Sequence, residues 1–209
     1  MKAVVKFKDG KDGWEIRDVE RVDPEPGEVE IEVRYVGICG SELHLYHDQH
    51  FYIPPVIVGH EFSGVISRVG ANVKGWNVGD NVVSENQVGA CRACEYCRSG
   101  LMHFCAERKP VGYVSNGYWT QYVCRPSWML HKVPPAVSLE EAALTEPTTV
   151  AVSALCERHQ IKTGDVVLVQ GCGPIGLLAA MVSKAAGAGH IIVTGTAADK
   201  EVRLPVAES

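Results

Sequence analysis

The 209-residue sequence has no continuous apolar run of the roughly 18–20 residues that would span a bilayer. The opening residues, Met1 to Phe7, also lack the apolar core of a signal peptide, so the sequence predicts a cytoplasmic protein without a membrane partner. Basic residues are in deficit, since 20 Lys and Arg stand against 25 Asp and Glu and give a formal net charge of -5. This sign disfavours nucleic-acid binding.

Compositional bias typical of disorder is absent as well, because 46% of the residues are hydrophobic and only 22% are charged. The eight cysteines are plentiful by comparison. Without a signal for export, cysteines at close spacing indicate metal ligation rather than a disulfide framework. Four of them crowd into one segment, whereas Cys39, Cys124, Cys156 and Cys172 are scattered.

The first 130 residues predict β structure. Short segments rich in β-branched residues occur at 4–7, 29–36 and 64–69, and the second of them alternates apolar and polar residues. Turn clusters at 23–27 and 77–80 separate them. Many short strands with glycine and proline between them favour a barrel-like β domain.

The pattern changes after Pro134-Pro135. Ser138 followed by Leu139-Glu140-Glu141 is typical of a capped helix start, and Pro147 is expected to open a second helix that ends near residue 159. A buried strand at 165–170, a helix of small residues to about 187 and a strand at 190–194 then predict a β-α-β unit. Two parallel strands cannot bury both faces of a sheet, so this second domain is expected to be incomplete.

The spacing Cys91-x2-Cys94-x2-Cys97-x7-Cys105 is the strongest chemical signal. Four thiolates satisfy tetrahedral Zn²⁺ and leave no position for water or substrate, so the spacing predicts a structural zinc lobe at about 87–109. An iron–sulfur cluster is the alternative, and it is weaker because no proline follows Cys105 and no second cluster motif is present.

Two further motifs lie upstream of the lobe. One is Gly59-His60-Glu61-x2-Gly64-x5-Gly70, and the other is Gly37-Ile38-Cys39-Gly40-Ser41, in which two glycines flank a cysteine. Together with the cysteine lobe, Glu146-Pro147 and the glycine loop described below, in this order, they resemble the zinc-containing medium-chain dehydrogenase/reductase family, whose members include alcohol and polyol dehydrogenases. The resemblance implies a GroES-like β-barrel catalytic domain, 1–146, followed by the opening β-α-β of a Rossmann domain, 147–209.

Within that resemblance, Cys39 and His60 match the first two ligands of a catalytic zinc, so that two zinc ions per chain are expected. Glu146 stands where the best-known alcohol dehydrogenases have a cysteine, and Glu61 follows the histidine, as in the sorbitol, threonine and butanediol dehydrogenase branch. A Cys/His/Glu set leaves one coordination position open for an alcohol oxygen. Either Glu61 or water would complete the resting shell. As an acid at a helix start, Glu146 also fits the helix dipole.

Ser41 and His44 match the proton relay of the family, in which a hydroxyl beside the metal accepts the proton of the alcohol and an imidazole receives it. Glu42 departs from the family pattern, because an aspartate usually follows the relay residue and supports the zinc histidine. We assign His47 and His50 no role and expect them at the surface or the rim of a cleft.

The glycine loop Gly171-x-Gly173-Pro174-Ile175-Gly176 follows a strand and opens a helix, which is typical of dinucleotide binding. The acidic residue that would bind the NAD ribose is missing from the end of the next strand, where Thr194-Gly195-Thr196 stands. This favours NADP over NAD, with Thr196 and Lys200 as candidates for the 2′-phosphate. The alternative is that Asp199 binds the ribose after a longer loop.

The sequence therefore predicts a zinc-dependent oxidoreductase that transfers a hydride from a secondary alcohol or polyol to NAD(P). Members of the family run to about 350 residues, and the resemblance implies that the full-length protein is a homo-oligomer (a dimer or tetramer). The alternative from a different class is a truncated, non-catalytic zinc-binding fragment of such a dehydrogenase. Pro205 falls where the next helix should form, a position that is tolerated near a helix start.

Overall fold

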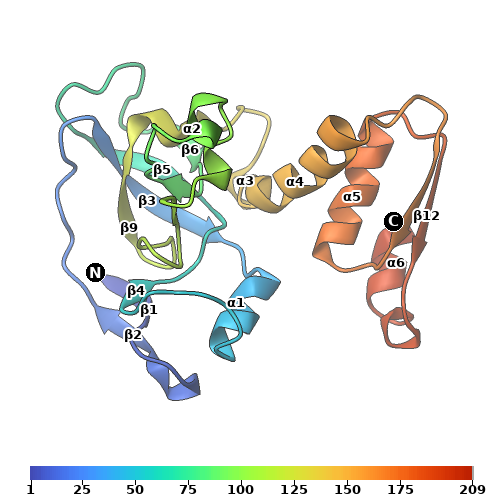
Figure 1. Ribbon diagram of the computed structural model, residues 1–209, viewed down its shortest axis with the longest axis horizontal. Helices are drawn as coiled ribbons and strands as arrows, with labels where there is room; N and C mark the ends of the chain where they lie inside the picture. The colour runs from blue at the N-terminus through green and yellow to red at the C-terminus, as the bar shows by residue number, and fades with distance from the viewer. Residues whose placement is uncertain (209) are drawn as a thin grey trace. The chain divides into compact units, whose positions relative to one another are not determined.

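The computed structural model describes residues 1–208 and divides into two compact units between Leu144 and Thr145 (Figure 1). The boundary expected from sequence lies two residues later, after residue 146. Glu146 therefore belongs to the second unit, of which it is the second residue. The two units are described separately below.

The first unit is built mainly from short antiparallel strands. One sheet has the order β2-β1-β4, a second has the order β10-β6-β5-β3-β9, and β7 pairs with β8. The strands are β1 (Lys2–Lys6), β2 (Trp14–Asp18), β3 (Glu28–Val36), β4 (Val56–Ile57), β5 (Phe62–Val69), β6 (Asn81–Ser84), β7 (Gln87–Val88), β8 (Lys109–Pro110), β9 (Tyr122–Pro126) and β10 (Leu130–Lys132).

The predicted fold class is confirmed, although within residues 1–208 no sheet closes into a barrel. The strand β3 lies between β5 and β9, and its register with β5 shifts between Glu30 and Ile31 and again between Val33 and Tyr35. Such shifts bend a strand and increase its twist, which curves the sheet around its core. The main core cluster includes Val29, Ile31, Phe62, Ile66, Val82, Val111, Tyr118, Val123 and Leu130.

Short helices connect these strands. They are η1 (Lys11–Gly13), α1 (Gly40–Tyr46), α2 (Glu95–Arg98), η2 (Met102–Phe104), η3 (Ser127–Met129) and α3 (Leu139–Ala142). The predicted cap of α3 is present, because Ser138 Oγ accepts a hydrogen bond from the Glu141 backbone N–H at 3.1 Å. The Glu141 carboxylate in turn accepts one from the Ser138 backbone N–H at 2.8 Å, which completes a capping box.

The second unit contains the predicted β-α-β arrangement. The strands β11 (Val166–Gln170) and β12 (His190–Thr194) pair in parallel, and the helix α5 (Pro174–Ala185) lies between them in sequence and beside β12 in Figure 1. The preceding helix α4 (Thr145–Val152) continues as a π-helical segment, η4 (Ser153–Arg158), and the unit ends with η5 (Ala197–Asp199) and α6 (Arg203–Glu208). In the two-stranded sheet Val166, Leu168 and Ile192 are exposed.

One detail at a proline differs from the sequence-based expectation, and another agrees with it. Pro147 was expected to open its helix, but α4 begins two residues earlier, at Thr145. Pro205 is the third residue of α6, where a proline costs no intrahelical hydrogen bond. None of the described helices is long and apolar enough to cross a membrane.

Candidate active site and metal centres

The four cysteines of the lobe converge, and their Sγ atoms all lie within 4.8 Å of one another. Cys91 Sγ and Cys97 Sγ are 3.9 Å apart. In a tetrahedral site with a Zn–S distance of about 2.3 Å, two sulfur atoms are separated by roughly 3.8 Å. The arrangement fits one zinc ion held by four thiolates better than an iron–sulfur cluster, whose cysteines lie further apart around several metal atoms.

Backbone geometry supports the thiolate character of this site. The N–H groups of Ala93 and Cys94 donate to Cys91 Sγ at 3.5 and 3.2 Å, and these hydrogen bonds lower the pKa of the Cys91 thiol. The Cys91 N–H donates to Cys105 Sγ at 3.4 Å. Two turns of backbone around sulfur atoms, rather than an apolar core, therefore organise the lobe, as a structural metal site requires.

A second cluster brings Cys39 and His60 together with Glu42, one ligand atom from each lying within 4.8 Å of the others. Cys39 precedes α1, and its backbone N–H donates to Glu42 Oε2 at 2.8 Å. The other carboxylate oxygen, Glu42 Oε1, lies 2.7 Å from His60 Nδ1. Since this contact is made by Nδ1, Nε2 is the nitrogen of His60 that could bind a metal.

Glu42 is 3% exposed, so its longer side chain fits a closed space between the two ligands. Although Glu42 replaces the aspartate of the family pattern, its carboxylate still lies beside His60. A buried anion held by a backbone N–H and placed against imidazole fixes the ring orientation, as a supporting carboxylate of a zinc histidine does.

Glu61 lies next to this cluster and is 5% exposed. A Cβ at Gly37 would collide with the Glu61 carboxylate, so the glycine is needed for this close approach. The Gly37 N–H donates to the Glu61 carbonyl at 3.1 Å, and the indole N–H of Trp119 donates to the Gly37 carbonyl at 3.1 Å. Glu146 is at the start of α4 in the second unit, and its place among the zinc ligands stays a prediction.

The two relay candidates lie on α1 but have different partners. Ser41 Oγ accepts a hydrogen bond of 2.7 Å from the hydroxyl of Tyr113. His44 Nδ1 lies 3.4 Å from Gln49 Oε1, and the Gln49 N–H donates to the His44 carbonyl at 2.8 Å. Tyr113 was not identified from the sequence, in which it belongs to no motif.

The glycine loop has the geometry that a dinucleotide loop needs. Gly171 has a φ of 114°, and Gly173 caps α5, with Pro174 in its first turn and Ile175 exposed beside it. A Cβ at Gly176 would collide with the Gly171 carbonyl, so this glycine lets the helix approach the strand end. The first backbone N–H groups of a helix have no partner within the helix, so those at the start of α5 can bind an anion. With 12 residues, α5 is also long enough to contribute its dipole.

Thr196 and Asp199, the alternative ligands for the cofactor ribose, bind each other. Asp199 Oδ2 accepts hydrogen bonds from the Thr196 N–H at 2.9 Å and the Thr196 hydroxyl at 2.7 Å, and Arg203 donates to Oδ1 at 3.1 Å. These bonds, that of the Thr196 side chain first, lower the pKa of Asp199. The Thr196 hydroxyl would have to leave Asp199 to donate to a 2′-phosphate, whereas Lys200 is exposed.

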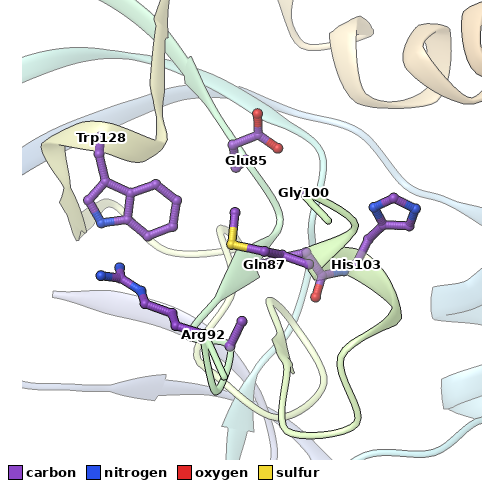
Figure 2. Close-up of a pocket in the computed structure, with 9 residues that line it drawn as sticks. Glu85, Gln87, Arg92, Gly100, His103 and Trp128 are labelled. Atoms are coloured by element: carbon purple, nitrogen blue, oxygen red, sulfur yellow. The ribbon is translucent and has the colours of Figure 1, made fainter. Parts of the chain in front are cut away.

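A pocket of about 370 Å³ lies beside the cysteine lobe, between β7, the lobe and η3. Figure 2 shows Trp128, Arg92, Gln87 and Glu85 around it. No residue that the sequence predicted for zinc or for proton transfer lines this pocket. We therefore assign it no part in the proposed reaction.

Comparison with known proteins agrees with this geometry. The model of the alcohol dehydrogenase GroES-like domain matches residues 25–135. A sorbitol dehydrogenase from Halalkalibacterium halodurans is 42% identical over all of this chain and 60% of its own length. A D-arabitol-phosphate dehydrogenase from Enterococcus avium is 36% identical over all of this chain and 59% of its own length.

Solved structures show the same fold. A zinc-binding dehydrogenase from Sinorhizobium meliloti, bound to NADP, superimposes with a TM-score of 0.90 at 28% identity, over 99% of this chain and 58% of that one. The 2R,3R-butanediol dehydrogenase of Bacillus subtilis superimposes with a TM-score of 0.86 at 36% identity, over 99% of this chain and 60% of that one.

Two clusters of side chains that could ligate a metal in a strand-rich unit, followed by a β-α-β unit with a glycine loop, are what the sequence resemblance to zinc-containing dehydrogenases implies. The chain belongs to the zinc-containing medium-chain dehydrogenase/reductase family. It spans about three fifths of the length of the curated relatives that it matches.

Proposed function

We propose that this chain carries the metal sites and the cofactor loop of a zinc-dependent dehydrogenase that oxidises a secondary alcohol or polyol with NAD(P)⁺. The observation that carries the proposal is the cluster of Cys39, Glu42 and His60, in which Glu42 and His60 are buried and Cys39 is half-buried. Ser41 directly precedes Glu42 in the sequence. A thiolate, an imidazole and a supporting carboxylate form a donor set that suits Zn²⁺.

Cys39, His60 and Glu146 would hold the catalytic zinc, with Glu61 or water in the resting shell, and the four cysteines of the lobe would hold a structural zinc. When bound, zinc supplies a Lewis acid that polarises the alcohol oxygen, and NAD(P)⁺ accepts the hydride. Ser41 would take the proton of the alcohol, and His44 would receive it and release it to water. The glycine loop of residues 171–176 would bind the pyrophosphate and so fix the nicotinamide against the substrate.

The preference for NADP is part of this proposal and depends on the acid missing from the end of β12. The exposed Lys200 is the cation closest in sequence to that position. We also propose that the whole protein acts in the cytoplasm on a small-molecule substrate and assembles as a homo-oligomer. The acidic net charge supports the absence of a nucleic-acid partner.

The test combines cofactor binding with turnover. NAD(P)H fluorescence titration and assays with sorbitol, 2,3-butanediol and L-threonine, the compounds named for the relatives, should show binding and activity in the zinc-loaded protein. Cys39→Ser should lower kcat/KM by roughly a hundredfold or more, because several kcal/mol of charge stabilisation are lost. Cys124→Ser, the same change on β9, is the matched control and should keep turnover.

Full turnover in Cys39→Ser would contradict zinc catalysis at this site. A protein that binds zinc but neither binds NAD(P)H nor oxidises any of the three compounds would favour the non-catalytic fragment instead.

A further inference from the structure

Tyr113 lies in the loop between β8 and β9, and this loop is held tightly against the segment that carries His60. A Cβ at Gly112 would lie only 2.8 Å from the Gly59 carbonyl oxygen, and the φ of Gly112 is 82°. A Cβ at Gly117, further along the same loop, would lie closer still to the Gly59 carbonyl oxygen, at 2.2 Å. Since only glycine allows this approach, the backbone fixes the position of Tyr113 beside His60.

The hydroxyl of Tyr113 joins two residues of the proposed site. It donates to Ser41 Oγ at 2.7 Å and lies 3.2 Å from His60 Nδ1. A serine hydroxyl has one hydrogen and two acceptor positions. Because Ser41 accepts from Tyr113 at one position, its second acceptor position is left for the hydroxyl proton of the substrate, and its own hydrogen is left for the next group of the proton relay.

The ring of Tyr113 is equally constrained. The side chain is 9% exposed and packs in a core cluster with Leu45, Val56 and Val58. The imidazole of His50 stacks on it, with ring centroids 4.6 Å apart and an angle of 27° between the planes. The Ile53 N–H also donates to the Tyr113 carbonyl at 2.8 Å. A hydroxyl on such a ring has a defined position, so it can orient a partner at little entropic cost.

We propose that Tyr113 is a positioning residue of this site, which orients the Ser41 hydroxyl toward the substrate oxygen and affects catalysis through Ser41. The inference depends on the proposed function. It adds a residue that lies 72 positions from Ser41 and that no motif of the sequence contains. His50, to which the sequence gave no role, supports the ring.

A double-mutant cycle tests whether Tyr113 acts through Ser41. In the zinc-loaded protein, Tyr113→Phe removes the hydroxyl and keeps the ring on His50. We expect kcat/KM for the best of the three compounds above to fall about tenfold, a typical effect of removing one orienting hydrogen bond. In a Ser41→Ala background the same change should cost less than about twofold, because contacting residues that act as a unit are not additive.

Tyr118→Phe is the matched control. Tyr118 is buried in the first unit, and its hydroxyl donates to the Glu85 carbonyl at 3.1 Å. This variant loses a buried tyrosine hydroxyl outside the proposed site, so it should lower the free energy of unfolding like Tyr113→Phe but leave kcat/KM within about twofold of the parent protein. An equal loss of kcat/KM in the two variants would make Tyr113 merely structural and overturn the proposal. An unchanged loss in the Ser41→Ala background would do the same.

A readout without turnover separates this inference from the proposed function. In the zinc-loaded chain, the His60 imidazole nitrogen resonance, assigned by its disappearance in His60→Gln, should shift in Tyr113→Phe and stay in place in Tyr118→Phe. An unshifted resonance in Tyr113→Phe would mean that the Tyr113 hydroxyl does not lie beside His60, and so would contradict the hydroxyl position on which the inference depends. A shifted resonance in a protein that oxidises none of the compounds would preserve the contact and reject the proposed function.

Discussion

At the residue scale, Glu42 contacts both of the proposed zinc ligands in the first unit. One of its carboxylate oxygens accepts from the Cys39 N–H at 2.8 Å, and the other lies 2.7 Å from His60 Nδ1. A side chain that orients two ligands at once should affect metal affinity more than fold stability, because the cost of a poorly oriented ligand appears only on metal binding.

Glu42→Gln removes the negative charge beside His60 and keeps the shape of the side chain. We expect the affinity of the Cys39–His60 site for zinc to fall by about 10- to 100-fold. Competition with a chromophoric chelator measures this directly. Glu141→Gln is the matched control, because Glu141 also closes a capping box at a helix start and has no metal ligand beside it. Equal zinc affinities in Glu42→Gln and the parent protein would contradict the role of Glu42.

Residues in local motifs could be predicted from the sequence, whereas residues paired over long distances could not. The lobe cysteines lie within 15 residues, and their spacing alone indicated one metal centre. The contact between Ser41 and Tyr113 depends on glycines at 59, 112 and 117 that let two loops touch, and no period or motif in the sequence indicates such packing. The sequence showed that Glu42 departs from the aspartate of the family pattern, but only the structure shows that its longer side chain fits between Cys39 and His60.

At the element scale, Glu30 ties β3 to its neighbours by a buried ion-pair network. Its carboxylate accepts hydrogen bonds from Arg21, from Ser67 at 2.5 Å and from Arg68. Burial would raise the pKa of Glu30, but the hydrogen bonds from Arg21, Arg68 and Ser67 outweigh it and hold the pKa well below its ordinary value of 4.5. The charge of Glu30 therefore stabilises the folded state.

Because the pKa of Glu30 is lower in the folded chain than in the unfolded one, its contribution is complete above pH 4.5 and is lost as the pH falls further. Glu30→Gln should lower the free energy of unfolding of the first unit by about 2 kcal/mol at pH 7, since the two arginines are partly exposed, and by less at pH 3. Urea unfolding at both pH values measures this. Glu32→Gln is the control, because Glu32 lies on the same strand and its partner Arg34 is more exposed; it should change the free energy of unfolding little at either pH. An equal effect of the two variants would refute the stabilising role of the network.

In the turn between β11 and α5, one glycine has room for a side chain and another does not. A Cβ at Gly176 would collide with the Gly171 carbonyl, whereas a Cβ at Gly173 meets no atom within 4 Å, and Gly173 has an ordinary φ of -74°. Gly176→Ala should therefore lower the thermal midpoint of the second unit. Overpacking of this kind lowers the free energy of unfolding by about 1–3 kcal/mol, which corresponds to a shift of several degrees. Gly173→Ala should leave that midpoint unchanged, as calorimetry of both variants can show, and equal midpoints would refute the predicted collision.

The positions of the strands could be predicted better than their burial or the closure of the sheet. The strands at 166–170 and 190–194 lie where their β-branched residues placed them, but the expectation of a buried strand was wrong. None of their residues is buried, because a sheet of two strands leaves much of both faces uncovered. The sheet of the first unit was expected to close as a barrel, and in the described residues it stays open. Closure depends on the pairing of distant edge strands, which alternation within each strand does not encode.

At the scale of the whole molecule, the cluster around Cys39 and His60 and the cluster of the four lobe cysteines both belong to the first unit. The glycine loop belongs to the second unit. Zinc binding should therefore stabilise the first unit more than the second. A structural zinc contributes folding free energy to the unit that encloses it, because the unfolded chain has no preformed site. The second unit is held by its own strands and by α5, with no cysteine cluster among its described residues.

Removal of zinc with a chelator should consequently lower the thermal midpoint of the first unit and leave that of the second unchanged. Hydrogen exchange resolves the two, through amides of β3 and β5 on one side and of β11 and β12 on the other. Cys94→Ser should reproduce the loss in the first unit, and Cys156→Ser, the same change at an exposed site in the second, should not. Equal loss of protection in both units on chelation would mean that zinc stabilises the molecule as one cooperative whole. Full stability of Cys94→Ser combined with lost turnover would instead assign the chemical step to the lobe and reverse the division between the two zinc sites.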